Sequence, residues 1–331
     1  MAVGIQPGEL VGSDVSQAER DRIPSRAALQ RLRRDGVALV CLGIVVVFVL
    51  LAVLAPVITR LVGVQLDAGD PTRDLDAYNY PAFGPPDHGF TWRAPLGISP
   101  NQADDNLAAW LYGARTSLGV AAAATLLATV IGVTVGLVAG WSGGWVDRFV
   151  GFVTEVFLSV PFLLVALALA PVLVSRFGAD ADRLQLWQLG SLVAVLSLFG
   201  WMPLARLIRA EVRQLREQEF VVAARAVGVR PRRILSHELL PNLTGPIIVS
   251  ASLSLPAFVA AEAGLAYLGL GVSGLPSWGR TIDQAVPYYS SYPLYLFTPV
   301  VSVLLLVVAL NLLGDAVRDA LDPRTRHGAV S

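Results

Sequence analysis

Six apolar runs interrupt this chain, and each is about as long as a helix must be to cross a bilayer. A helix rises 1.5 Å per residue, so roughly 20 residues span about 30 Å of hydrocarbon. Backbone groups in lipid must bond to one another, and the alternation typical of a membrane β-barrel does not occur, so we expect helices. The predicted spans are residues 37–58, 116–140, 149–174, 190–208, 245–270 and 294–313.

The composition also indicates a membrane protein. Of the 331 residues, 54% are hydrophobic and only 15% are charged, which is unusual for a soluble domain. The first run follows 36 polar residues and is too long for a cleaved signal peptide, so we interpret it as a true span. Cys41 is the single cysteine, and His88, His237 and His327 lie far apart, so neither a disulfide within the chain nor a metal site is predicted.

The distribution of arginine predicts the orientation of the spans. Every basic side chain is an arginine, and the arginines cluster before the first span, between the fourth and fifth spans, and after the sixth. With six spans these three regions lie on one side, which the positive-inside rule identifies as the cytoplasm. The expected parts are a cytoplasmic tail (1–36, disordered over its first 25 or so residues), an irregular extracytoplasmic loop (59–115), a core that holds the remaining five spans (116–324) and a second cytoplasmic tail (325–331).

The segment 211–241 has the pattern of two short helices that meet at a corner. Apolar residues recur with a period near 3.6 from residue 211 to residue 227, which predicts the first helix. Gly228 would end it in a left-handed conformation, and Pro231 suits the first turn of the second helix. We expect the second helix to end before Pro241.

The side chains of this segment favour contact with another protein. Ala223 and Ala224 leave the backbone open to close approach, which is typical of a helix that fits into a partner's groove. A solvated loop that only sets topology would explain the arginines, but not the Gly–Pro corner or the alanine pair. A DNA-binding helix–turn–helix has suitable charge, but spans at both ends of the segment make that interpretation improbable.

The segment resembles the EAA loop of permeases from binding-protein-dependent ABC importers, and we call residues 211–241 the coupling loop. Ala223-Ala224, Gly228 and Leu240-Pro241 match the family's spacing, whereas Val222 replaces its usual Glu and Glu238 replaces a commonly hydrophobic residue. In that family the loop forms coupling helices that sit in a cleft of the ATPase subunits. The resemblance assigns this contact to Glu219, Val222, Ala223, Ala224, Arg225, Gly228, Arg232, Arg233, Leu240 and Pro241.

Further motifs resemble the dipeptide and oligopeptide branch of that family, in the order of its second permease, often called the C-type subunit. They are LYGARTSL at 111–118, GGWVD at 143–147, AEAGLAYLGLG at 261–271, PSWG at 276–279, NLLGD at 311–315 and RDALDP at 318–323. The resemblance covers about residues 37–324. The branch's Gly-Thr-Asp-x-x-Gly-Arg-Asp motif is replaced here by GISPNQADD at 97–105.

The resemblance implies an all-α integral membrane protein with the type I ABC importer permease fold, six transmembrane helices and both termini in the cytoplasm. The implied partners are a homologous second permease, two ABC ATPase subunits, an extracytoplasmic solute-binding protein and membrane lipid, but no nucleic acid. ATP and Mg would bind to the ATPases, and this chain would hold no cofactor or metal. The expected cargo is dipeptides or oligopeptides, with nickel, glutathione or another small solute as alternatives for the same machinery in the plasma membrane.

Four residues inside the predicted spans are candidates for the pathway or an interface. Glu155 and Glu262 must face protein or water, and we favour structural hydrogen bonds to another helix or to the partner permease over a direct role in the pathway. Pro161 and Pro256 each remove a backbone hydrogen bond, and static kinks are commoner than hinges at such positions.

Other classes of protein fit the sequence less well. It contains no phosphate-binding loop, which needs a lysine, and no Gly-x-Ser-x-Gly elbow, so we expect no catalysis by the chain itself. A self-powered secondary transporter or channel remains an alternative, although the inverted repeats typical of such proteins are not evident. A membrane receptor or scaffold without transport is the third possibility, and it predicts no association with ATPases.

Overall fold

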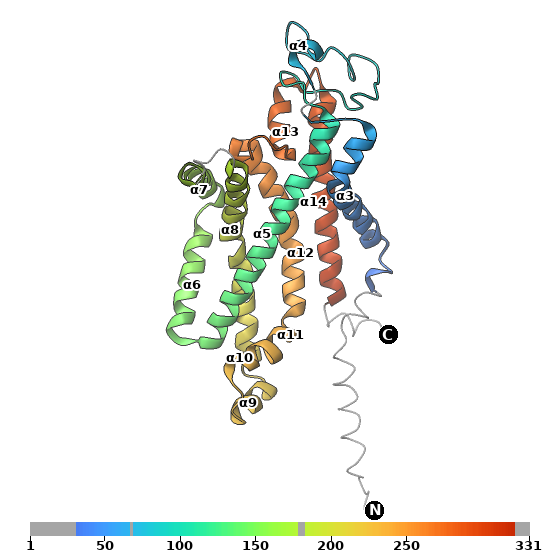
Figure 1. Cartoon of the computed structure of the whole chain (residues 1–331). Helices are drawn as coiled ribbons and strands as arrows, with labels where there is room; N and C mark the ends of the chain where they lie inside the picture. Colours follow the sequence, from blue (N-terminus) through green and yellow to red (C-terminus); the bar gives the residue numbers. More distant parts are fainter. Residues whose placement is uncertain (1–30, 67–68, 178–182, 322–331) are drawn as a thin grey trace, which may run out of the picture.

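The computed structural model describes residues 31–66, 69–177 and 183–321. Within these ranges the chain is helical apart from its loops, and the only β-structure there is three isolated bridges. Figure 1 shows an elongated bundle with short helices at one end and a long loop at the other. We call the first the arginine-rich end (residues 206–243) and the second the loop end (residues 63–105 with 271–292).

Five helices are long and apolar enough to cross a membrane, and they confirm five of the predicted spans. Each extends beyond its predicted run, and the loop predicted at 59–115 is correspondingly shortened to 63–105. The predictions for residues 1–30 and for the tail 325–331 lie outside the described residues. The five helices are α3 (Gly36–Val62), α5 (Asn106–Ser142), α8 (Leu184–Leu215), α12 (Thr244–Leu265, continued by the π-helical turn η3, Ala266–Leu270) and α14 (Pro293–Leu321).

The third span is not the single straight helix that the run 149–174 predicts. It consists of α6 (Gly144–Ser159) and α7 (Phe162–Phe177), which meet at 93°. Val160 is extended and Pro161 follows it, because proline lacks the N–H that would continue α6 and its preceding residue avoids helical geometry. Pro161 therefore marks a sharp bend, and α6 lies along one side of the bundle in Figure 1.

The most extensive helix contact among the described residues joins α5 to α8, and three glycines at four-residue spacing make it close. A Cβ atom on Gly132, Gly136 or Gly140 would lie 2.7–2.8 Å from atoms of α8. At Gly136 the nearest such atom is Cβ of Ile208, at 2.7 Å. Small residues at this spacing allow helix backbones to approach in a membrane, so the two helices form one tightly packed seam.

Trp278 joins several elements beneath the loop end. It begins α13 (Trp278–Ala285), is fully buried, and packs edge-on against Phe48 of α3 at 5.5 Å between ring centroids. Its indole Nε1 donates to the carbonyl oxygen of Trp110 at 3.1 Å, and its backbone N donates to Ser117 Oγ at 3.3 Å. These contacts fix α13 against α3 and α5, and a short 3-10 turn η4 (Val286–Tyr288) follows it.

The long loop at the loop end is held by its own small core. Its described residues include one short helix, α4 (Pro71–Asp74), and a buried cluster of Leu75, Ala94, Ile98 and Ala103. Arg93 Nη2 pairs with the buried carboxylate of Asp74 at 3.0 Å. The loop therefore has a defined arrangement with little regular secondary structure.

Candidate functional site

The coupling loop begins with a turn that the sequence did not predict. The helix expected from 211 to 227 is two helices, since α8 ends at Leu215 and α9 covers Glu219–Ala226. Gln218 between them is extended. The apolar period continues across this turn because both helices face one core, in which Val212 of α8 and Val221 of α9 are fully buried.

The predicted corner is confirmed, but the predicted end of the second helix is wrong. Gly228 has φ +78°, and Pro231 opens the next helix, α10 (Pro231–Arg233). The helix continues through a π-helical turn, η2 (Ile234–Leu239), into α11 (Leu240–Asn242), which contains Pro241. Proline is tolerated there because it lies at the first turn of α11, directly after a π-helical turn that already departs from the α-helical bonding pattern.

A hydrophobic core fixes the coupling loop to α8. It is formed by buried side chains from both sides of the corner and from the last turns of α8, and Ala224 and Leu235 pack at its edge. Each fully buried aliphatic side chain contributes about 1.5–3 kcal/mol, so the loop cannot separate from α8 without a large cost. The buried members are Leu204, Ile208, Val212, Val221, Ile234, Leu239 and Leu243.

The opposite face of α9 exposes apolar side chains. Val222 is 53% exposed and Val227 81% exposed, and Phe220 and Ala223 are also exposed. Val222 stands where the EAA loop usually has Glu. Its exposure shows that this position points away from the core and is open to a partner. An apolar patch on a short helix at the end of a bundle is typical of an interaction surface.

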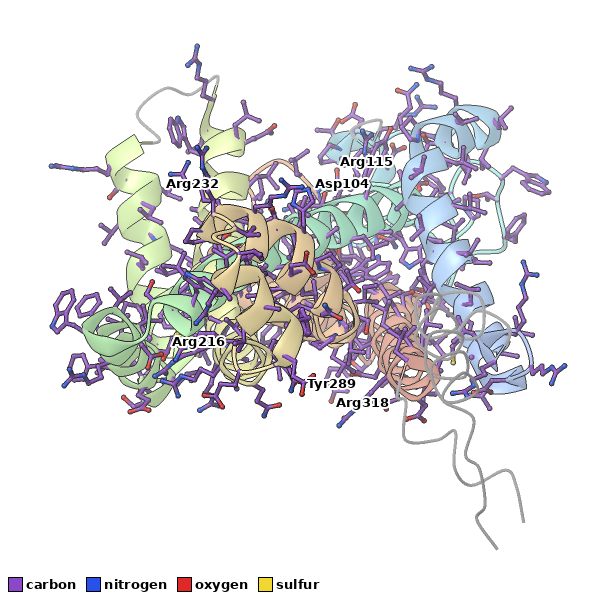
Figure 2. All side chains as sticks on the ribbon, turned by 90° about the horizontal axis from the view of Figure 1, so that it is seen from below. Asp104, Arg115, Arg216, Arg232, Tyr289 and Arg318 are labelled. Carbon is purple, nitrogen blue, oxygen red and sulfur yellow. The ribbon has the colours of Figure 1, made fainter. Side chains whose placement is uncertain are left out.

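The remaining predicted loop residues are mostly exposed as well. Figure 2 views the molecule from below and labels Arg232. Exposed side chains are those of Glu219, Arg225, Arg232, Arg233 and Pro241, whereas Ala224 and Leu240 are half-buried. Thus the structure brings all ten predicted residues into one module, whose two sides share the core beneath α9.

Two residues that sequence reasoning did not assign connect this module to α5 and α6. Trp141, near the end of α5, lies under the Arg225 guanidinium at 4.2 Å from the ring centroid, and its carbonyl oxygen accepts from Arg216 Nη1 at 3.1 Å. Asp147 of α6 pairs with both Arg209 and Arg213 of α8. Asp147 belongs to the GGWVD motif, but nothing in that motif indicates its partners, which lie more than 60 residues away.

The four span candidates lie in different environments. Glu155 is exposed on α6, Pro161 is exposed at the α6–α7 bend, and Pro256 is buried inside α12. Glu262 is 1% exposed next to the hydroxyl-bearing Ser117 and Ser277. The hydroxyls of Ser117 and Ser277 are the groups next to its carboxyl oxygens, which form no other contact with a polar group among the described residues. The structural hydrogen bond that we favoured, to another helix or to the partner permease, therefore stays a prediction.

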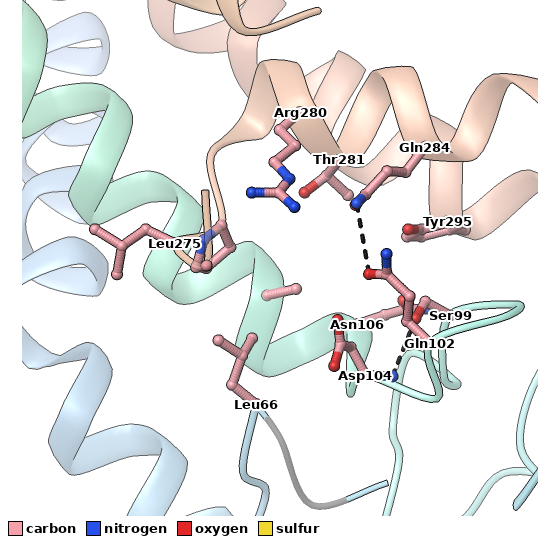
Figure 3. A pocket seen from close by; sticks show the side chains of 13 residues that line it. Leu66, Ser99, Gln102, Asp104, Asn106, Leu275, Arg280, Thr281, Gln284 and Tyr295 are labelled. Carbon is pink, nitrogen blue, oxygen red and sulfur yellow. Dashed lines mark hydrogen bonds between the residues drawn. The ribbon is translucent and has the colours of Figure 1, made fainter. Parts of the chain in front are cut away.

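The loop end contains a polar cavity of about 160 Å³, shown in Figure 3. Arg280 and Gln284 of α13 face the segment 99–106 across it, and Gln284 Nε2 donates to Gln102 Oε1 at 3.5 Å. Buried Asn106 also lines the cavity, and its Oδ1 has no partner among the described residues. The cavity lies at the end of the bundle opposite to the coupling loop.

Known proteins place this architecture in a family. Residues 132–327 match the binding-protein-dependent transport system inner membrane component, and residues 24–81 match the N-terminal transmembrane domain of oligopeptide transport permease C. The chain therefore belongs to the family of inner membrane components of binding-protein-dependent transport systems, as the coupling-loop motif predicts. With its apolar helices, this makes it a multi-pass inner-membrane protein.

Its relatives include peptide permeases whose sequences align with almost the whole chain. The dipeptide transport system permease protein DppC of Alkalihalophilus pseudofirmus is 32% identical over 92% of this chain and 91% of its own. The oligopeptide transport system permease protein OppC of Bacillus subtilis is 32% identical over 90% and 89%. The glutathione transport system permease protein GsiD of Salmonella typhimurium is 32% identical over 94% of each chain.

A solved structure supports the fold. A chain of the MetNI methionine ABC transporter in an inward-facing conformation aligns with a TM-score of 0.51 at 20% identity, over 65% of this chain and 96% of that chain. The likeness confirms the predicted type I permease fold.

Proposed function

We propose that this chain is the C-type permease subunit of an ATP-driven importer and forms the translocation pathway with a homologous second permease. The observation that carries the proposal is the exposed apolar face of α9, which rests on a core shared with α8. Two ATPase subunits dock under the pair, one of them mainly on this coupling loop. ATP and Mg bind to those subunits, and this chain transmits their motion without catalysing a reaction.

The arginine distribution supports one orientation of the complex. The arginine-rich end, with both chain termini, lies in the cytoplasm because arginine-rich segments are retained there. A solute-binding protein delivers cargo to the loop end, where α13 and the 63–105 loop form the surface.

The cargo of the complex is dipeptides or oligopeptides. Two of its relatives, a dipeptide permease and an oligopeptide permease, support this class. The glutathione permease has the same sequence identity to this chain, 32%, and supports glutathione as a second candidate. Glutathione is itself a small peptide, so the two candidates share amide and carboxylate chemistry.

Tryptophan in place of Ala223 tests the docking surface. The side chain is exposed on α9, so the larger ring would block a groove without disturbing the core below. In the purified complex with both ATPases, we expect Ala223→Trp to lose ATPase subunits and peptide uptake in proteoliposomes. Gly228→Pro should break the corner, because proline requires φ near −65° and Gly228 has φ +78°, and should leave ATP hydrolysis uncoupled from uptake.

An exposed alanine outside the loop provides the control. Ala210→Trp on α8 makes the same change of size and should retain the ATPases. Normal ATPase retention and uptake in Ala223→Trp would contradict the docking surface. Uptake by the purified chain alone, driven by a proton or sodium gradient, would instead identify a secondary transporter.

A further inference from the structure

Two arginines near the loop end have no partner among the described residues. Arg60 lies in the last turn of α3, and Arg115 lies nine residues into α5, about 14 Å along that helix. Both side chains are exposed, and neither makes a hydrogen bond or an ion pair with a described residue. A guanidinium group keeps its charge in a protein, so each of them requires an anion or water.

Both arginines lie at the same surface of the membrane. The apolar runs predict that the first span ends at residue 58 and the second begins at residue 116, so Arg60 and Arg115 immediately flank the hydrocarbon. The structure places Tyr112 with each of them, since its side chain lines one cleft with Arg60 and another with Arg115. Figure 2 labels Arg115 on α5. Both positive charges therefore lie at the level of lipid headgroups.

The two clefts adjoin and differ in chemistry. The cleft with Arg60 has a volume of about 600 Å³ and lies between the end of α3 and α5. The cleft with Arg115 has a volume of about 470 Å³, lies between α5 and α8, and has walls such as Val120 and Val193. Tyr112, Leu275 and Pro276 line both clefts.

Gly119 keeps the apolar cleft open. It is exposed on α5 and lines this cleft, and a Cβ atom at this position would meet no atom within 4 Å. The cleft therefore combines an apolar wall of helical residues with cationic groups at one end. A ligand that matches it carries an anionic group joined to a hydrocarbon chain.

We propose that these clefts bind one anionic phospholipid, with its phosphate between Arg60 and Arg115 and an acyl chain along Gly119. Guanidinium groups bind phosphate oxygens through two parallel hydrogen bonds, and the surrounding leaflet supplies the lipid. The phosphate gives both guanidinium groups an anionic partner at the edge of the hydrocarbon, although its single negative charge balances only one of the two positive charges. This site is independent of the cargo and of the orientation of the chain.

Lipid retention by the complete transporter tests the site. The complex is exchanged into phosphatidylcholine nanodiscs that contain a minor fraction of phosphatidylglycerol, and the lipids that remain after mild detergent extraction are counted by native mass spectrometry. We expect one phosphatidylglycerol per copy of this chain. Arg60→Gln and Arg115→Gln should each weaken retention roughly fivefold, and the double variant by about 30-fold.

Two further variants separate this site from general attraction to the membrane. Gly119→Leu places a branched side chain in the apolar cleft, where its Cβ meets no protein atom within 4 Å, and should expel the lipid although both arginines remain. Arg206→Gln removes an exposed arginine near the predicted end of the fourth span, where it lines neither cleft, and should retain the lipid. If Arg115→Gln prevents assembly of the complex, Arg60→Gln and Gly119→Leu still provide the test.

Three results would overturn the proposal. The first is equal retention of phosphatidylglycerol by the wild type and the double variant, and the second is equal loss in Arg206→Gln. The third is a structure of the complex in which a carboxylate of the second permease contacts Arg115 and fills the cleft. Inorganic phosphate that displaces the lipid from the wild type would support the arginine contacts, whereas phosphate bound to Gly119→Leu would show that the headgroup subsite survives without the chain.

Discussion

Alanine in place of Gly136 would add one methyl group to the closest part of the α5–α8 seam. Its Cβ would lie 2.7 Å from Ile208 Cβ and 2.8 Å from the carbonyl oxygen of Ala205, whereas carbon atoms normally approach to about 3.5–4.0 Å. The helices must therefore separate by roughly 1 Å at this point, which forfeits a quarter to a half of the dispersion energy of the atoms that face each other.

The size of the effect follows from two opposing terms. Overpacking of a closely packed contact costs about 1–3 kcal/mol, whereas replacement of a helical glycine by alanine gains roughly 0.5–1 kcal/mol. We expect Gly136→Ala to lower the free energy of unfolding by about 0.5–2 kcal/mol. Gly119→Ala is the matched control on the same helix, because its Cβ meets no protein atom within 4 Å and it gains helix propensity without a contact cost. Both variants are compared after detergent has removed the lipid proposed above, so that its loss does not affect the control.

Thermal unfolding of the purified complex, followed by tryptophan fluorescence, measures the difference between the two variants. The helix-propensity term is common to both, so the difference reports the cost of contact at the seam alone. We expect Gly136→Ala to melt below the wild type and Gly119→Ala to melt at or above it. Equal melting temperatures for the two variants would show that α5 and α8 are not in close contact at Gly136.

Two other residues give further predictions. Asp147→Asn removes the carboxylate between Arg209 and Arg213, and should destabilise the complex by roughly 2–4 kcal/mol, below the usual cost for a fully buried pair because Arg213 is half exposed. Arg148→Gln, which removes only a side-chain bond to the carbonyl oxygen of Gly144, is the control in the same melting assay. Burial raises the pKa of Asp105 to about 6 from an ordinary 3.8, so folding favours the protonated carboxyl group. Its contribution to stability is therefore fully present below pH 4 and is lost as the pH rises through 6, a loss of about 2–3 kcal/mol. Between pH 4 and 7 the wild type should lose this much more free energy of unfolding than Asp105→Asn, as measured from melting curves of the two.

The sequence located the spans because bilayer thickness fixes how long an apolar run must be, and five runs fall within the helices observed. Hydropathy reports how apolar a segment is but not how its helix axis is oriented. It could therefore not show that the run 149–174 turns by 93° at Pro161. The same limitation explains the break between α8 and α9. The helical period stayed in phase across the turn, because Val212 and Val221 face one core from two helices.

The structure of the candidate site was predictable where the local sequence alone determines the backbone conformation. Gly228 and Pro231 define a corner through their own backbone preferences, so their roles could be read from the sequence. The partners of Asp147 could not, because they depend on how α6 packs against α8. Gly132, Gly136 and Gly140 have a spacing typical of close helix contacts, which the sequence displays, but the identity of the facing helix required the structure.

The coupling loop and the loop end are connected through α5 and α8 rather than through flexible segments. The core beneath α9 includes Ile208 of α8, and Val133 and Leu137 of α5 pack against it. At the far end of α5, Ser117 accepts a hydrogen bond from the backbone of Trp278 in α13. Closely packed interiors have low compressibility and transmit strain, so we expect a movement of α9 to reach α13 through the joined helices while the seam at Gly136 stays closed. Loosening the seam should therefore weaken coupling between the two ends even where both remain intact.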